Sequence, residues 1–202
     1  MNKKVKIIIM DDVHIEGRSQ NQIVDFQNNV KSKIEAAKEL NQIPIVVCAG
    51  DIGEGTAGIE WAKEFDCDVL YTCGNHEFWN RDYFQTYKDI YEKLKNPEYK
   101  NIHFLNNNVF ELHGIRFIGG TMWTNVGNFL NWYENKNLSL KYFTVMGDFK
   151  KITLKGWYTT ENIKKLKSFM ASNISQMNPI VESNILSLIE NEYFNPLFEL
   201  EI

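Results

Sequence analysis

The chain has 202 residues, of which 44% are hydrophobic and 24% are charged, and its formal net charge at pH 7 is -4. This balance is typical of a packed globular protein and excludes a disordered or low-complexity chain, and the length predicts a single domain over residues 1–202. Acidic and basic residues are interleaved without a basic stripe, so stable nucleic-acid binding is not expected. The three cysteines lack the spacing of a zinc ribbon or a redox motif and are predicted to be reduced core residues.

The first apolar run is too short for a secretory signal. It is interrupted by Lys6 and stops at Asp11. No other uninterrupted apolar stretch is long enough to cross a bilayer. The sequence therefore predicts a cytoplasmic protein without a membrane partner.

The first hundred residues alternate between short β-branched runs and longer segments with helical spacing. This order predicts an α/β fold in which helices cover a sheet whose strands are apolar on both faces. The predicted strands are 4–10, 43–48 and 69–73, and the predicted helices are 21–40, 57–65 and 81–94.

After Pro97 the pattern changes to short apolar runs separated by turn residues. The runs 102–105, 109–112 and 115–118 predict antiparallel sheet. The spacing of apolar residues from Glu161 onward predicts a mainly helical tail over 157–202, so that residues 1–125 form the core that carries the motifs.

Polar clusters follow each of the first three predicted strands. Because the carboxyl ends of strands in an open α/β sheet share one rim, these clusters are expected to converge. In an extended segment side chains two apart point the same way, so Asp12 and His14 are predicted to face one ion. A carboxylate and an imidazole suit a transition metal better than calcium. The clusters are Asp12-Val13-His14, Gly50-Asp51-Ile52-Gly53-Glu54 and Gly74-Asn75-His76-Glu77.

The residue types in these clusters predict separate roles. The two oxygens of Asp51 can bridge two ions, which together would clamp the attacking and leaving oxygens of a phosphoryl displacement. Asn75 adds a neutral oxygen ligand, which keeps the site attractive to a phosphate dianion. His76 is predicted to stay off the metal and to donate a proton to the leaving group.

The three clusters resemble the first three signature motifs of the calcineurin-like metallophosphoesterases, which are Asp-x-His, Gly-Asp-x-x-(Asp or Glu) and Gly-Asn-His-(Asp or Glu). The resemblance covers roughly the first 125 residues. It implies a fold with helices flanking mixed β-sheets, hydrolysis of phosphate esters by a metal-activated hydroxide, and a small phosphate ester or a phosphorylated molecule as substrate. By resemblance, two divalent ions (Mn, Fe or Zn) are bound, Asp12 and His14 holding the first, Asp51 bridging and Asn75 holding the second, while His76 acts on the leaving group.

The chain also departs from that family. Family members carry a later histidine and a Gly-His-x-His motif that complete both metals, whereas the only histidines here are His14, His76, His103 and His113. The chain thus resembles a truncated or frame-disrupted member, with an incomplete second sheet and a weak second metal site. An alternative is a non-catalytic remnant that acts as a binding or interaction module. An uncovered sheet also predicts a homo-oligomer.

Structural interpretations compete with these roles. Asp12 and His14 are also compatible with a helix cap and a surface histidine. Glu54 and Glu77 are expected to be first-turn helix residues outside the metal shell. His103 and His113 are expected to be structural. A generic nucleotide-binding domain is disfavoured because no glycine-rich phosphate loop follows the first strand.

Overall fold

The computed structural model describes residues 3–123 and 147–155. Its contacts form two compact units, one of Met1–Trp79 with Thr86–Met122 and the other of Asn80–Gln85 with Trp123–Ile202. The fold is mixed α/β, as predicted. The helical tail predicted for 157–202 lies outside the described residues, and the single domain predicted for 1–202 stays a prediction.

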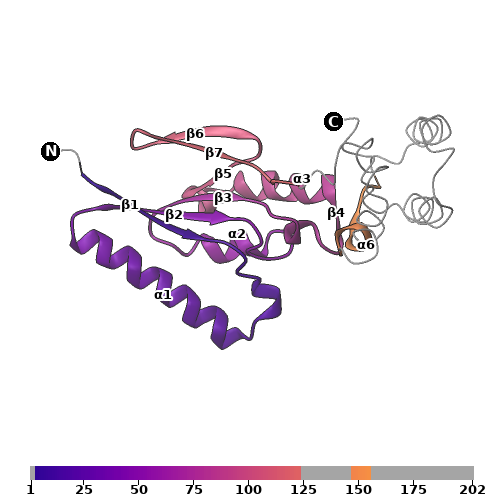
Figure 1. Cartoon of the computed structure of the whole chain (residues 1–202), viewed down its shortest axis with the longest axis horizontal. Coiled ribbons are helices and arrows are strands. Elements are labelled where there is room, and N and C mark those ends of the chain that lie inside the picture. The colour runs from indigo at the N-terminus through magenta and orange to yellow at the C-terminus, as the bar shows by residue number, and fades with distance from the viewer. Residues whose placement is uncertain (1–2, 124–146, 156–202) are drawn as a thin grey trace, which may run out of the picture. The chain divides into compact units, whose positions relative to one another are not determined.

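A four-stranded parallel sheet organises the first unit (Figure 1). Its strands pair in register, so that Ile8, Val46 and Val69 lie side by side on one face. Because all four strands run the same way, their carboxyl ends meet at one edge, as expected from the sequence. In order across the sheet the strands are β1 (Val5–Met10), β2 (Ile43–Ala49), β3 (Asp68–Thr72) and β5 (Ile102–Phe104).

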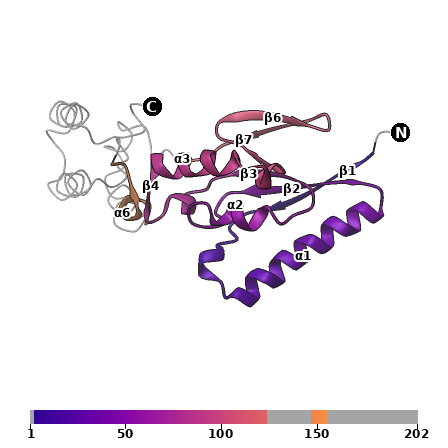
Figure 2. The same ribbon diagram turned by 180° about the vertical axis from the view of Figure 1, so that it is seen from behind.

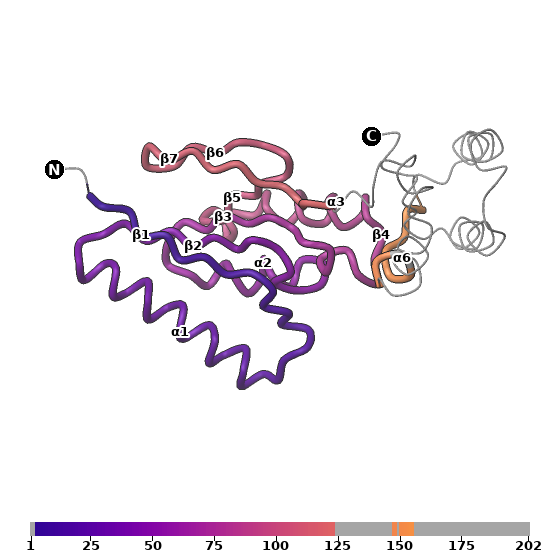
Figure 3. The backbone as a smooth tube through the Cα atoms, in the orientation of Figure 1, coloured from indigo at the N-terminus to yellow at the C-terminus, as the bar shows by residue number. Residues whose placement is uncertain are grey.

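Three α-helices connect these strands (Figures 2 and 3). The first helix begins with a capping box, in which the Ser19 hydroxyl accepts from the Gln22 N–H and the Gln22 side chain accepts from the Ser19 N–H. The helices are α1 (Gln20–Glu39), α2 (Ala57–Ala62) and α3 (Tyr83–Leu94), of which the part from Thr86 belongs to this unit. Three short 3-10 helices are η1 (Ile15–Gly17), η2 (His76–Phe78) and η3 (Pro97–Tyr99).

The described helices that connect the strands lie on one face of the sheet (Figures 1 and 2). The strand order follows the chain order without reversal, and right-handed connections then place successive helices on the same side. A hairpin covers part of the opposite face, where it packs on the buried residues Ile45, Leu70 and Leu105 (Figure 1). The edge strand β1 leaves Ile9 69% exposed.

This hairpin consists of β6 (Asn108–Leu112) and β7 (Ile115–Gly119), which pair antiparallel as predicted. The prediction of antiparallel pairing for 102–105 is wrong, because β5 runs parallel to β3. The reason is the helical crossover α3, which returns the chain in its original direction. A three-residue strand carries too little pattern to reveal that direction.

The second unit contains a short parallel pair and one helical turn. Strand β4 (Arg81–Asp82) pairs with β8 (Ile152–Thr153), which follows α6 (Asp148–Lys151). The helix predicted to begin at residue 81 therefore begins two residues later, after the strand. Within 3–123 and 147–155, none of the helices has the length and apolar character that a membrane span requires.

Candidate metal centre

The loops that follow β1 and β2 are joined by backbone hydrogen bonds. The N–H groups of Asp12 and His14 donate to the carbonyls of Gly50 and Asp51 at 3.2 and 3.0 Å. Asp12 (φ 48°), His14 (φ 49°) and Asp51 (φ 53°) are all left-handed. The segment that carries Asp12 and His14 is therefore not extended. The reason given for the shared direction of their side chains is wrong. Their side chains still converge, because the left-handed turns bring them together.

Two glycines allow the loops after β2 and β3 to touch. A Cβ atom at Gly50 would lie 2.9 Å from the Gly74 nitrogen, and Gly50 has a φ of 97°. A Cβ atom at Gly74 would clash with the Asp51 carboxylate. Gly50 is thus required by close approach and by its turn, and Gly74 is required by close approach.

A buried carboxylate holds these loops together by hydrogen bonds. Glu77 lies in the first turn of η2, as predicted, but it is fully buried at 0% exposure. Its oxygens accept hydrogen bonds from the Gly74 N–H at 2.7 Å and the Tyr71 hydroxyl at 2.8 Å. They also accept from the N–H groups of Asp51, Ile52 and Gly53 at 3.1, 3.0 and 3.5 Å. No local sequence pattern indicates this role of Glu77 in holding the loop that carries Asp51.

The donor atoms of Asp12, His14 and Asp51 all lie within 4.8 Å of one another. His14 Nε2 and Asp12 Oδ1 lie 3.4 Å apart. Asp12 is exposed, whereas His14 and Asp51 are half-buried. The structure thus brings together three of the four predicted metal ligands. The fourth, Asn75, is half-buried, directly precedes η2 and lies next to His76 in the chain, and its role as a ligand stays a prediction.

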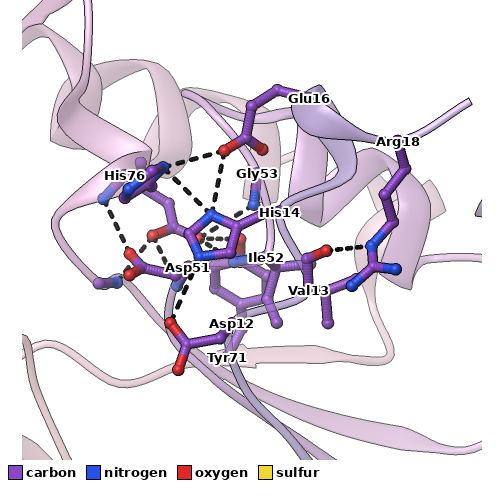
Figure 4. A network of polar contacts seen from close by, with 12 residues as sticks. Asp12, Val13, His14, Glu16, Arg18, Asp51, Ile52, Gly53, Tyr71 and His76 are labelled. Atoms are coloured by element: carbon purple, nitrogen blue, oxygen red, sulfur yellow. Dashed lines mark hydrogen bonds and ion pairs between the residues drawn. The ribbon is translucent and has the colours of Figure 1, made fainter.

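His76 lies at the same edge and is held on several sides (Figure 4). Its backbone N–H donates to Asp51 Oδ1 at 2.8 Å, which orients the carboxylate. Its ring stacks on Trp79 with centroids 3.4 Å apart and meets the His14 ring edge at 4.2 Å. Its Nδ1 lies 2.9 Å from Glu16 Oε1. The predicted proton donor is therefore beside the predicted metal ligands.

Glu16 is the residue of this cluster that the sequence analysis missed. It lies in η1 and contacts both imidazoles (Figure 4). Its sequence signal is the alternation of Asp12, His14 and Glu16. Each of these residues can carry charge or bind an ion, but only Asp12 and His14 are among the predicted ligands.

The carboxylates of the centre have shifted pKa values. Burial raises the pKa of Asp51, and the charge of Asp12 adds to this effect, while the His76 N–H and the charges of His76 and His14 oppose it. Burial alone would raise the pKa of Glu16, but hydrogen bonds from its own backbone, His76 and His14 outweigh it and lower the pKa. A half-buried Asp51 beside a second carboxylate favours a cation, because a cation offsets both the repulsion and the lost solvation.

The remaining histidines, His103 in β5 and His113 in the turn between β6 and β7, both contact Asp68. His103 Nε2 lies 2.8 Å from Asp68, and its ring stacks on Phe110. His113 Nε2 lies 3.6 Å from the other Asp68 oxygen. These contacts fit the structural roles expected for both residues.

Comparison with known proteins gives a relative but no family. No family model matches the sequence. The chain is 26% identical over 152 residues to Uncharacterized protein L509 of Acanthamoeba polyphaga mimivirus, a match that covers 71% of this chain and 53% of that protein. The chain thus spans about half the length of this relative, whose name states no activity.

Proposed function

We propose that the chain is a calcineurin-like metallophosphoesterase that hydrolyses phosphate esters. The observation that supports this proposal most is the convergence of Asp12, His14 and Asp51 from two strand ends to within 4.8 Å, with His76 beside them. The parallel sheet and its clustered carboxyl ends agree with the α/β part of that fold.

The donor set suits two divalent transition-metal ions such as Mn, Fe or Zn. Carboxylate oxygens and imidazole nitrogens are ligands that these ions accept. Asp12 and His14 would hold the first ion, Asp51 would contribute to both ions, and Asn75 would hold a weaker second ion. When bound, such ions supply Lewis acidity and lower the pKa of a coordinated water to about 7.

The residues of the chain then hold the proposed ligands in position and supply a proton. The His76 N–H fixes one oxygen of Asp51, so that the second oxygen keeps a defined direction. Glu77 holds the backbone of the Asp51 loop by several hydrogen bonds, which reduces the freedom of the centre before substrate binds. His76 donates its proton to the leaving alkoxide, a step typically worth about 10²–10⁴ in rate.

A second candidate function is a binding module that has the family's ligand-bearing half without turnover. The arrangement of the histidines favours it, because His103 and His113 contact Asp68 instead of adding ligands to the centre. In that case the protein would bind a divalent ion or a phosphate ester without hydrolysing it. A cytoplasmic location and a homo-oligomeric state are part of both proposals.

The decisive experiment is hydrolysis of p-nitrophenyl phosphate and bis-p-nitrophenyl phosphate by purified, Mn²⁺-loaded protein. Turnover that is lost in Asp51→Asn and kept in Asp25→Asn, a matched change at an exposed position of α1, would support the enzyme. Folded protein that binds Mn²⁺ without turnover would support the binding module. Folded protein that takes up no divalent ion and binds no phosphate ester would refute both.

A further inference from the structure

A single carboxylate oxygen contacts the rings of both histidines at the centre (Figure 4). Glu16 Oε1 lies 2.9 Å from His76 Nδ1 and 3.2 Å from His14 Nδ1. The two Nδ1 atoms are 3.2 Å apart. The three groups come from sequence positions up to 62 residues apart, so this contact is built by the fold.

The chemistry of the carboxylate decides where the ring protons lie. An ionised carboxylate only accepts hydrogen bonds, so an imidazole nitrogen that is hydrogen-bonded to Glu16 carries a hydrogen. In a neutral imidazole the lone pair is then on Nε2. His14 Nε2 is the atom that lies 3.4 Å from Asp12 Oδ1, on the side of the predicted metal ligands.

We propose that Glu16 is a positioning residue that sets the tautomers of both His14 and His76. This inference rests on the proposed function. By accepting from His14 Nδ1–H, Glu16 leaves Nε2 free to bind the first ion, because a metal-binding histidine commonly donates its other N–H to a carboxylate. By accepting from His76 Nδ1–H, it turns Nε2, the nitrogen on the side away from Glu16, toward the position proposed for the leaving group.

The surroundings support a positioning role. The His76 side chain is 17% exposed and stacks on Trp79, so Glu16 and Trp79 together restrict the ring. The Glu16 side chain is 26% exposed, so most of it is covered by the protein although the residue lies at the surface. A competing explanation is that Glu16 itself binds an ion together with His14 and His76, whose donor atoms also lie within 4.8 Å of one another. In that arrangement His14 would bind the ion through Nδ1. Its Nε2 would then not bind an ion together with Asp12 and Asp51.

Nitrogen NMR of protein labelled with ¹⁵N-histidine at pH 8 separates these explanations. In the metal-free wild type, both rings are expected to carry hydrogen on Nδ1. In Glu16→Ala, both are expected to move toward the Nε2–H form, with Glu16→Gln intermediate because its amide oxygen still accepts. Glu64→Gln, which removes an exposed carboxylate after α2, should leave the spectrum unchanged. Wild-type rings with hydrogen on Nε2, or tautomers unchanged in Glu16→Ala, would overturn the proposal.

Metal loading provides the second measurement. In the Zn²⁺ form, His14 is expected to be bound through Nε2, and Glu16→Ala should weaken Zn²⁺ binding about 10–100-fold without abolishing it. A bond from Zn²⁺ to either Nδ1 would show Glu16 to be a ligand and would overturn the positioning role. With Mn²⁺, Glu16→Ala should lower kcat more than it changes KM, and Glu16→Gln should recover part of the loss. Failure of the proposed function would instead be seen as no ion uptake and no hydrolysis by the wild type, whatever the tautomers are.

Discussion

Replacing Glu77 by glutamine tests whether the buried carboxylate holds the centre together. Four backbone N–H groups and the Tyr71 hydroxyl donate to its two oxygens. In the amide one oxygen becomes an NH₂ group, which cannot accept. Whichever way the amide turns, two N–H groups lose their acceptor, those of Asp51 and Gly74 on one side or those of Ile52 and Gly53 on the other.

The expected loss of stability follows from this count. An unsatisfied buried donor destabilises a protein by about 1–3 kcal/mol, so two of them predict roughly 2–6 kcal/mol for Glu77→Gln. Burial raises the pKa of Glu77, and the hydrogen bonds from Tyr71 and the backbone N–H groups offset only part of this shift. Burying the ionised carboxylate therefore already destabilises the folded protein. Removing the charge recovers part of that cost, which favours the lower half of the range.

Urea unfolding gives the free energy directly, with Glu64→Gln as the control at an exposed position. Tyr71→Phe removes one donor and leaves the acceptor intact, so it should destabilise less than Glu77→Gln. In the double variant the two changes should couple by about 0.5–3 kcal/mol, because the residues are in contact. A loss below about 1 kcal/mol in Glu77→Gln, or strictly additive changes, would show that the hydrogen bonds to Glu77 do not hold the loops.

Three further predictions concern packing, metal and pH. Gly74→Ala should destabilise the fold by about 1–3 kcal/mol and abolish Mn²⁺ binding measured by calorimetry, because its Cβ atom meets the Asp51 carboxylate, whereas Gly17→Ala has open space and should do neither. Mn²⁺ at about 100 times its Kd should stabilise the wild type by about 2.7 kcal/mol in thermal unfolding, and Asp51→Asn should remove this gain. Hydrogen bonds, first from Lys93 and then from Tyr99, lower the pKa of Glu60 to about 2. The contribution of the Glu60 carboxylate to folding stability is therefore present above the ordinary pKa of 4.5 and is lost as the pH falls from there toward 2. The Glu60 side chain is 40% exposed, so solvent screening limits this contribution to about 1 kcal/mol, and Glu60→Gln should flatten the pH dependence of unfolding in that interval.

The parts of the fold that the sequence predicted well are those with a strong local signal. The run of β-branched residues in β2 and the helical spacing of α1 gave their elements to within a residue or two. The direction of β5 was missed because it depends on the crossover before it and not on its own three residues. The strand at 81–82 was missed for a similar reason, since its partner lies about 70 residues further along the chain.

The centre shows the same division between local and non-local information. Asp12, His14, Asp51 and His76 were predicted because each follows a strand and belongs to a motif that can be seen in the sequence. Glu16 was missed because only the fold brings it to His76. The buried role of Glu77 was missed because a glutamate after a histidine has the same local pattern whether its side chain points to water or into the protein.

The backbone of the centre gives a physical reason for this dependence on distant residues. Asp12, His14 and Asp51 all have left-handed φ values, and a residue held in such a conformation typically stores about 1–3 kcal/mol of strain. Local sequence alone would relax these three turns. They persist because the loops after β1 and β2 bond to each other and because Glu77 binds the second loop to the third. Strain that is concentrated at the predicted ligands and balanced by their neighbours is what a preorganised ion site requires. A change that loosens Glu77 should therefore weaken ion binding as well as folding, even though Glu77 is not among the proposed ligands.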